Sequence, residues 1–402
     1  MTGMETQSQT SRLVTIGRAF LFVFFIYLFL VAVKMFGASA TIFTDQYQGI
    51  WTQIQQRLDN PFFGLFLGVF AAAVMQSSSA TTSIAVTLVA TGLVPLENAV
   101  TIVMGANIGR SITCMIVALG YVRQKKMFAR AFPVSFIQDN FNILTACVCF
   151  TLEVTCHFLS RTARWIVSFL PASSAATTAD GGAAASGWLW NPIPVMADFP
   201  VNLVKHFMHD VCHFWPTAQA ILLGALGLFL LFFALKRITR TMTKITGNKV
   251  EVMINRVLSK SGWLTLFIGL IITMVVQSSA ITISLMIPLA AAGVVKLRTY
   301  YPIILGACLG TTITAVIAAM AYMGTPVEGV ANLGLEGLSI AVVHILFNLI
   351  GVLCFFPIPF LRIPMYTTEF FVPFLTRSRR YVFLWIALIF FVIPGLGLWL
   401  LW

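Results

Sequence analysis

QSSSATTSIAVTLVATGLVPLENAVTIVMGANIGRSITCMI, residues Gln76–Ile116, is repeated later in the same chain as QSSAITISLMIPLAAAGVVKLRTYYPIILGACLGTTITAVI, residues Gln277–Ile317. The two stretches align without a gap at an offset of 201 residues, and seventeen of the forty-one aligned positions are identical. An apolar composition alone would give far fewer identities, so we interpret the stretch as an internal duplication.

The duplication extends beyond this stretch in both directions. Carried backwards, the same offset places the apolar run Ile16–Phe36 on Thr217–Arg237. Carried forwards, with a few inserted residues, it places DNFNIL (Asp139–Leu144) on ILFNLI (Ile345–Ile350). The chain is therefore predicted to contain two copies of one unit of about 150 residues.

The composition is that of a protein that lies in a lipid bilayer. Hydrophobic residues make up 59% of the 402 residues and charged residues 9%, whereas soluble domains carry about 25% charge. Apolar runs near the roughly 20 residues that span the hydrocarbon recur from Phe20–Phe36 to Tyr381–Trp402. The net charge of +12 lies in short segments between these runs, so nucleic acid is not an expected partner. The first run has no cleavage site behind it, and we expect a retained helix.

Basic residues orient the two copies, because cytoplasmic loops carry an excess of Lys and Arg. In the first copy Arg12 and Arg18 precede the first run, and the segment after it, Gly37–Asn60, is nearly neutral. In the second copy the basic residues follow the equivalent run: Lys236, Arg237, Arg240, Lys244, Lys249, Arg256 and Lys260. The basic loop Arg123–Arg130 of the first copy is matched by the acidic segment Gly324–Glu336. Corresponding loops are therefore expected on opposite sides, with the N-terminus in the cytoplasm.

The predicted fold is an all-α polytopic membrane protein of two inverted-topology repeats, each with a re-entrant helical hairpin and a broken transmembrane helix. Its expected parts are repeat 1 at 1–158 with a hairpin at about 62–91, an external linker with an interfacial amphipathic segment at 159–215, inverted repeat 2 at 216–364 with a hairpin at about 262–292, and a C-terminal transmembrane segment at 365–402.

The QSS motifs place polar groups in the middle of apolar runs. Such a cluster is tolerated where helices break and line a cavity. Free amides at a helix start suit anions, and free carbonyls at a helix end suit cations. The glycine pairs Gly105/Gly109 and Gly306/Gly310 predict a second break in each copy. In a plainer interpretation the hydroxyls only bond to helix carbonyls or allow close packing; their recurrence at a fixed offset favours the site.

Ionisable residues within spans are candidates for function, and three stand out: the cation Arg110 and the carboxylates Asp139 and Glu153. Arg110 suits an anion, or a structural ion pair with Asp139; the sequence leaves both open. Asp139 is either a ligand for a small hard cation or a helix-packing group. Glu153 is expected to reach the lipid headgroups.

Cysteines and histidines predict no metal centre in the spans. The seven cysteines lack metal-type CxxC pairs, and a Cys156–Cys212 disulfide depends on an external loop. His206, His209 and His213 lie on the interfacial segment Asp198–Trp215, which fits a solvated face better than a zinc site. A serine hydrolase that pairs a QSS serine with His344 is disfavoured, because no GxSxG turn is present. His344 aligns with Gln138, and polar pairing across helices is expected for both.

With these motifs in view, the chain resembles the type II sodium-phosphate cotransporter family. The resemblance rests on MQSSSATTSIAV, IVMGANIGRSIT and FIQDNFN in the first copy, and on VQSSAITIS, IILGACLGTTITAVIAAM and VHILFNLIGV in the second. It implies that the paired QSS regions bind phosphate and sodium inside the membrane. The sequence departs from the family pattern at Arg110, where Thr is usual, at Cys308, where Asn is expected, and at Gln138, where His is common.

The predicted function is sodium-coupled uptake of inorganic phosphate across the cell (plasma or inner) membrane by alternating access, with a midplane site between the QSS motifs. The candidate phosphate ligands are Gln76, Ser77, Ser78, Ser79, Arg110, Ser111, Gln277, Ser278, Ser279 and Thr311. The candidate sodium ligands are Thr81, Thr82, Asn107, Asp139, Asn142, Thr282, Thr312 and Asn348. The alternative cargo is another oxyanion, sulfate or a carboxylate. Sodium is the expected co-transported ion, no organic cofactor or enzymatic activity is expected, and a homo-oligomer is left open.

Overall fold

The structure, a computed structural model, describes residues 2–170, 192–246, 261–323 and 333–402. Within these ranges every regular element is a helix. The first half contains α1 (Thr2–Gln46), α2 (Gln48–Leu58), α3 (Pro61–Met75), α4 (Ser78–Ala90), α5 (Leu96–Gly109), α6 (Ser111–Leu119), α7 (Lys125–Cys156) and α8 (Phe158–Ser168). The predicted linker falls mostly on 171–191, outside the described residues, as do the basic residues Lys249, Arg256 and Lys260 and the acidic loop at 324–332.

The second half repeats this succession of helices. After α9 (Pro192–His206) and η1 (Phe207–Val211) it contains α10 (Pro216–Thr246), α12 (Gly262–Val276), α13 (Ser279–Ser284), α14 (Met286–Ala291), α15 (Leu297–Gly310), α16 (Ile313–Met320) and α17 (Leu333–Phe355). The chain closes with η2 (Pro359–Leu361), α18 (Ile363–Leu375), α19 (Arg379–Ala387), η3 (Leu388–Val392) and α20 (Ile393–Leu401).

The offset of the sequence duplication is also an offset between helices. α3 and α12 begin and end 201 residues apart, and so do α5 and α15. α4 corresponds at the same offset to α13 and α14 together, which only Leu285 separates. The two copies therefore fold into the same elements in the same order.

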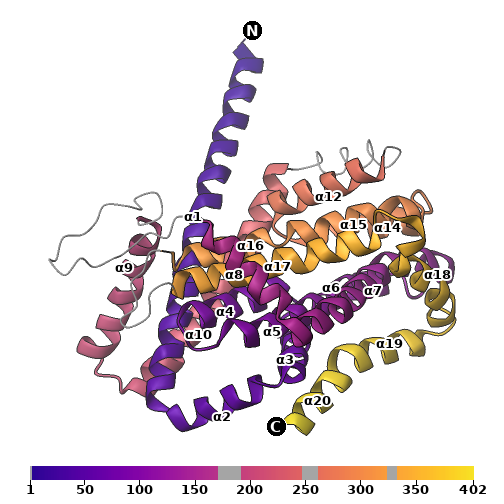
Figure 1. The fold of residues 1–402 in the computed structure, drawn as a ribbon. Coiled ribbons are helices and arrows are strands. Elements are labelled where there is room, and N and C mark those ends of the chain that lie inside the picture. Colours follow the sequence, from indigo (N-terminus) through magenta and orange to yellow (C-terminus); the bar gives the residue numbers. More distant parts are fainter. Residues whose placement is uncertain (1, 171–191, 247–260, 324–332) are drawn as a thin grey trace.

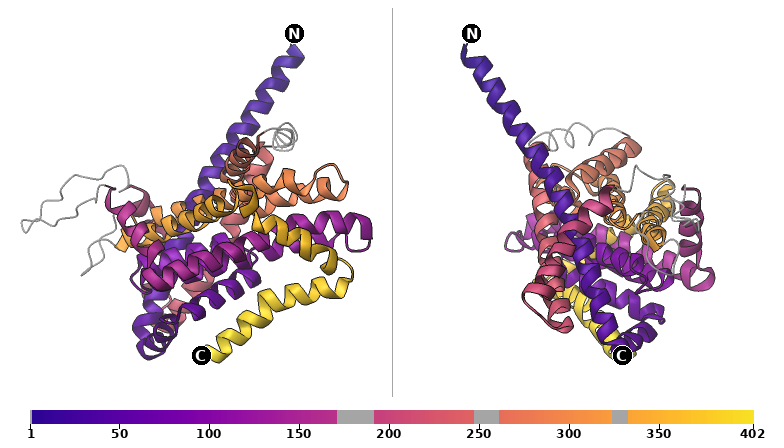
Figure 2. Two further views of the ribbon diagram at one scale, coloured as in Figure 1. Left: turned by 45° about the vertical axis from the view of Figure 1, so that its right-hand side comes forward. Right: turned by 90° about the vertical axis from the view of Figure 1, so that its left-hand side faces the viewer.

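Three helix pairs dominate the packing, one within each half and one between the halves. α3 lies along α5, α12 lies along α15, and α1 lies along α10 (Figure 1). The N-terminal part of α1 extends well clear of the other helices in every view (Figures 1 and 2). The C-terminal helices return to the first half, where α18 packs on α7 and α20 on α3.

Six helices of the described residues are long and apolar enough to cross a membrane: Val14–Gln46, Leu96–Leu119, Pro216–Thr246, Leu297–Met320, Gly334–Phe355 and Arg379–Leu401. Two more candidates are bent pairs, α2 with α3 at 103° and α7 with α8 at 80°. The prediction of an all-α protein with several candidate membrane spans is thus confirmed, and one candidate lies near the C-terminus.

The predicted hairpins are present as pairs of short helices. α3 has 15 residues and α4 has 13, fewer than the roughly 20 needed to cross the hydrocarbon. α3 starts cleanly because Asn60 accepts a hydrogen bond from the amide of Phe62 and Pro61 occupies the first helical position. Their bounds agree closely with the predicted 62–91 and 262–292.

The breaks predicted at the glycine pairs are much smaller than expected. Arg110, between α5 and α6, keeps helical angles of φ −63° and ψ −22°, so Leu96–Leu119 forms one apolar span. The glycines serve close packing instead. A Cβ on Gly105 would lie 2.1 Å from the carbonyl oxygen of Leu65, and one on Gly306 would lie 1.9 Å from that of Leu266. The sharp bends occur elsewhere, at the ends of α2 and α7.

Candidate functional site

Each QSS motif forms the turn between the two arms of a hairpin. Gln76 and Gln277 adopt the left-handed conformation, with φ of 51° and 57°. The next residues, Ser77 and Ser278, are extended, with φ of −152° and −153°. The predicted helix breaks within the QSS motifs are therefore confirmed, and their geometry is the same in both halves.

The second residue of each motif is a helix cap. Ser77 Oγ accepts a hydrogen bond from the amide of Ala80 at 3.1 Å, and Ser278 Oγ accepts one from the amide of Ile281 at 3.4 Å. The caps leave the two earlier amides of each first turn without an intrahelical acceptor. In the longer helix, α4, these amides belong to Ser78 and Ser79, which are therefore free to bind an anion.

The two tips lie between the halves. α4 packs against α16 and α17 of the second half, and α13 packs against α6 of the first. Cys114 Sγ on α6 contacts the carbonyl oxygen of Ala280 on α13 at 3.9 Å. The hydroxyl of Thr113 donates to the carbonyl oxygen of Gln76 at 3.2 Å and so fixes the first tip to α6. The first tip is thus held by α6 of its own half and by α16 and α17 of the other half. The second tip is held by α6 of the first half.

Several predicted ligands bond within their own helices. The hydroxyls that donate to carbonyls of the preceding turn are those of Thr81 to Ser77 at 3.0 Å, Thr282 to Ser278 at 3.3 Å, Thr311 to Ala307 at 3.0 Å and Thr312 to Leu309 at 2.8 Å. A hydroxyl that donates in this way keeps its lone pairs as acceptors. One of those of Thr282 already accepts a hydrogen bond from the hydroxyl of Thr273 at 2.9 Å. Thr82 Oγ1 is buried and has no partner among the described residues.

A buried polar cluster surrounds Arg110, which is 4% exposed. Its Nη2 donates at 3.4 Å to Oδ1 of Asn142 on α7 and at 3.4 Å to Oδ1 of Asn348 on α17. Asn142 also donates to Ser111 Oγ at 3.2 Å, and Asn348 donates to the carbonyl oxygen of His344 at 3.0 Å. The cluster therefore joins predicted phosphate ligands to predicted sodium ligands from both halves.

The proposed ion pair between Arg110 and Asp139 is wrong. Among the described residues no carboxylate lies within 4.0 Å of the guanidinium. Asp139 is fully buried and accepts a hydrogen bond at 3.1 Å from the indole nitrogen of Trp385 on α19. Its other oxygen, Oδ1, has no partner in the described part of the chain. Asp139 thus keeps a free oxygen for a cation while it packs against the C-terminal helices.

His344 pairs across helices, as predicted. Its Nε2 lies 3.1 Å from Oδ1 of Asn107 on α5, and Asn107 in turn donates to the carbonyl oxygen of Val103 at 2.9 Å. The imidazole contacts an amide and not a QSS serine, so nothing in this geometry favours a serine hydrolase. Gln138, at the equivalent position of the first half, has a buried Oε1 without a partner among the described residues.

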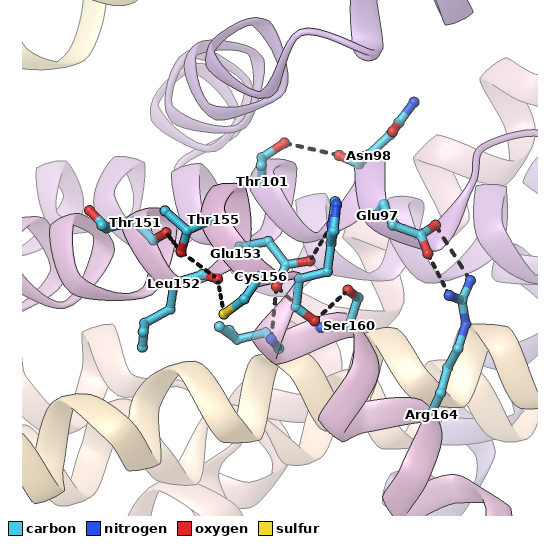
Figure 3. A network of polar contacts seen from close by, with 12 residues as sticks. Glu97, Asn98, Thr101, Thr151, Leu152, Glu153, Thr155, Cys156, Ser160 and Arg164 are labelled. Carbon is cyan, nitrogen blue, oxygen red and sulfur yellow. Dashed lines mark hydrogen bonds and ion pairs between the residues drawn. The ribbon is translucent and has the colours of Figure 1, made fainter.

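The expectation that Glu153 reaches the headgroups is wrong. Glu153 is 3% exposed, and its Oε2 accepts hydrogen bonds from the amides of Leu159 at 2.8 Å and Ser160 at 3.2 Å (Figure 3). The carboxylate therefore caps the first turn of α8, where the chain bends at His157 with φ of 52°. The sequence signal for this cap is a Glu five residues before the first residue of α8, Phe158.

The sequence interpretation also missed a buried cation. Lys34 on α1 is 8% exposed and forms an ion pair at 2.9 Å with Asp198 on α9. Its ammonium also lies 4.9 Å from the centre of the Tyr322 ring. Arg110 is therefore not the sole cation in a span. The signal was a Lys near the end of an apolar run and an isolated Asp in the later segment 159–215.

The remaining cysteine and histidine predictions concern the surface. All seven cysteines are free, so the Cys156–Cys212 disulfide is absent from the structure. Asp210 bonds to His209 at 2.6 Å, and this hydrogen bond with the nearby histidines holds the pKa of its carboxyl below the usual range. The described residues contain no group of three metal-binding side chains.

Comparison with known proteins identifies the family of the chain. The model of the Na+/Pi-cotransporter family matches residues 28–178 and 230–393. Sodium-dependent phosphate transport protein 2B of Homo sapiens is 26% identical over 452 residues, which cover 94% of this chain and 64% of the relative. Sodium-dependent phosphate transport protein 2A of Ovis aries is 27% identical over 438 residues, 95% of this chain and 67% of the relative. The chain thus spans slightly less than two thirds of the 2B relative. No solved structure matches it.

Proposed function

Because this chain belongs to the Na+/Pi-cotransporter family, we propose that it is a secondary active transporter that takes up inorganic phosphate together with sodium. The family is one of transporters, so the chemistry required is binding and release and not catalysis. The names of its relatives specify sodium-dependent phosphate transport, which favours phosphate over sulfate or a carboxylate. The cell membrane is its proposed location.

The observation that supports the proposal is the pair of equivalent tips, each of which lies against helices of the opposite half. Each presents a capped break at a QSS motif, and each packs on the opposite half. Phosphate is proposed to bind there to the exposed amides and hydroxyls. The assigned phosphate ligands are Gln76, Ser77, Ser78, Ser79, Arg110, Ser111, Gln277, Ser278, Ser279 and Thr311.

Sodium is assigned to oxygens of the tip helices α4 and α13, of α5, α7 and α17, and of Thr312 before α16. Hard cations prefer hydroxyl, carbonyl and carboxylate oxygens. The assigned sodium ligands are Thr81, Thr82, Asn107, Asp139, Asn142, Thr282, Thr312 and Asn348. Since opposite charges in a shared low-dielectric site attract, each ion raises the affinity of the other, and this reciprocal effect couples their transport.

Alternating access between two inverted repeats is the proposed mechanism, with repeat 1 at 1–158 and repeat 2 at 216–364. Contacts between helices that the topology assigns to the same side support it. Glu97, Arg164 and Glu336 belong to segments assigned to the outer side. Arg164 pairs with the carboxylate of Glu97 (Figure 3) and with that of Glu336 at 3.0 Å. Arg18 and Lys244, assigned to the cytoplasmic side, are joined by a hydrogen bond from the Arg18 guanidinium to the carbonyl oxygen of Lys244 at 3.0 Å.

Uptake by purified protein in proteoliposomes tests the proposed function. Radiolabelled phosphate should accumulate under an inward sodium gradient and should not accumulate when potassium replaces sodium. An excess of unlabelled phosphate should abolish the signal, whereas sulfate and a dicarboxylate should leave it largely intact. Equal uptake in sodium and potassium would overturn sodium coupling, and stronger inhibition by sulfate or the dicarboxylate than by phosphate would overturn the choice of cargo.

A further inference from the structure

The two halves of the site differ in charge at one position. The offset of 201 residues pairs Arg110 with Thr311, which occupy the same place after Gly109 and Gly310. Thr311 is neutral, and its hydroxyl donates to the carbonyl oxygen of Ala307 in its own helix. The first half therefore adds a fixed positive charge where the second half has a hydroxyl group.

The surroundings of Arg110 are those of a cation site. Asn142 and Asn348 occupy equivalent positions in the two halves, and their amide oxygens converge on one nitrogen, Nη2, at 3.4 Å each. Amide oxygens from two helices are typical ligands of a small cation. Here the guanidinium of Arg110 occupies the position between them. Asn142 and Asn348, assigned above to sodium, can therefore not bind one sodium ion together while the guanidinium stays there, and the sodium ions that remain depend on the other assigned ligands.

Two donors of the guanidinium have no oxygen or nitrogen acceptor in the described part of the chain, and the thiol of Cys308, a weak acceptor, also interacts with Arg110. Nε and Nη1 are buried and have no hydrogen-bond partner among the described residues. A buried cation without a counterion costs free energy, and a structural Arg would be expected to have its donors matched. Two unmatched donors on a 4%-exposed guanidinium instead point to an anion that binds beside it.

We infer that Arg110 is a tethered countercharge for phosphate, which takes the place of one co-transported sodium ion. The inference rests on the proposed function. Each negative charge of phosphate in a site of low dielectric needs a compensating positive charge. Arg110 supplies one such charge from the protein and does not cross the membrane. The chain therefore couples phosphate to one sodium ion fewer, and moves one positive charge less per cycle, than the same site with a neutral residue at position 110.

The test measures the ratio of sodium to phosphate from the reversal potential of transport in proteoliposomes. Wild type, Arg110→Thr and Arg110→Lys are compared, because Thr reproduces the second half and Lys keeps the charge. Arg110→Thr should raise the ratio by one, and Arg110→Lys should keep the wild-type ratio. An unchanged ratio in Arg110→Thr overturns the inference, whatever its phosphate affinity.

A second measurement tests the inference if the Arg110→Thr variant does not transport, because it follows phosphate binding and not transport. Binding of radiolabelled phosphate to detergent-purified protein without sodium should be about 10- to 100-fold weaker in Arg110→Thr, the effect of one charge-assisted contact. Equal sodium-free affinity in a monodisperse Arg110→Thr protein overturns the inference; if that variant does not fold, Arg110→Gln replaces it in both measurements. Absence of sodium-driven phosphate uptake by the wild type would instead overturn the proposed function, which is a separate outcome.

Discussion

Two glutamines set the position of the site. Gln76 and Gln277 are the last residues before each cap, and both have positive φ. The left-handed conformation suits Gly and costs a residue with a Cβ about 1–2 kcal/mol. A glutamine kept there twice has a use for its amide side chain, which we assign to phosphate binding and to bracing the tip.

Substitution of Gln76 tests this backbone strain. Gln76→Val places a β-branched side chain at φ of 51° and should lower the free energy of unfolding by about 1–2 kcal/mol. Gln76→Gly should fold at least as stably as wild type and transport less phosphate, because the amide is lost. Thermal unfolding in detergent measures the stability of each variant, and phosphate uptake measures its transport. Gln56→Val, at an exposed position, is the control. Normal transport by Gln76→Gly would exclude the side chain from the site.

Arg110 shows what a sequence can and cannot predict at this scale. Its place within a span and beside Gly109 identified it as a candidate for function. The sequence could not decide whether Arg110 faces an anion or forms an ion pair with Asp139. That decision needs the tertiary structure, in which Asp139 bonds to Trp385, more than two hundred residues later in the chain. Asp139 and Asn142 lie three positions apart on α7, yet only Asn142 contacts Arg110, and the sequence does not predict this difference.

At the scale of elements, the glycine pairs were correctly identified as structurally important, but they allow close helix packing and do not break the helices. Gly64, Gly68 and Gly105 allow backbone-to-backbone contact of α3 with α5, and Gly269 and Gly306 allow the same contact of α12 with α15. Small residues produce such contacts in membranes, where apolar burial between helices contributes little. The pattern of spaced glycines fits both a break and a close crossing, and only the partner helix distinguishes them.

Gly306→Ala tests the close crossing. The added methyl would meet the carbonyl oxygen of Leu266 at 1.9 Å, which forces α12 and α15 apart. We expect a loss of about 1–3 kcal/mol in stability and weaker transport, because α12 carries the second tip. Gly17→Ala is the control, since a Cβ there meets nothing within 4 Å. Equal melting of Gly306→Ala and wild type in detergent would contradict the packing.

Glu153 tests how α8 is held. Glu153→Ala leaves the amides of Leu159 and Ser160 without their acceptor and should cost about 1–3 kcal/mol. Glu153→Gln keeps an acceptor oxygen and should lose less. Exposed Glu369→Gln serves as the control in the same thermal unfolding measurement. A Glu153→Ala protein as stable as wild type would show that the cap is dispensable.

At the scale of the whole molecule, the sequence duplication predicts most of the helices and their order. One offset of 201 residues, read from the sequence, reproduces the bounds of α3 with α12 and α5 with α15. A constant offset predicts equivalent helices because equivalent sequences fold alike. It does not predict how the C-terminal helices return to α3 and α7, or how Lys34 pairs with Asp198, since these contacts have no counterpart in the other copy.

Inverted topology is a prediction about sides. In a protein without its native cysteines, Lys126→Cys and Lys244→Cys should react with a membrane-impermeant maleimide only from the cytoplasmic side. Ser168→Cys should react only from the outer side, because the charge pattern assigns residues 159–215 there. Labelling of Lys126→Cys and Lys244→Cys from opposite sides would contradict two inverted repeats.

Sharing of one phosphate site by both halves is most directly tested by binding of radiolabelled phosphate in sodium to Ser78→Ala, Ser279→Ala and the double variant. Ser135→Ala is the matched control, because that buried hydroxyl bonds only to Phe132 in its own helix. We predict that each single variant weakens the same phosphate site by about 5- to 10-fold, the effect of one hydrogen bond of about 1 kcal/mol, while Ser135→Ala binds normally. Normal phosphate affinity in either single variant would contradict a site that both tips share.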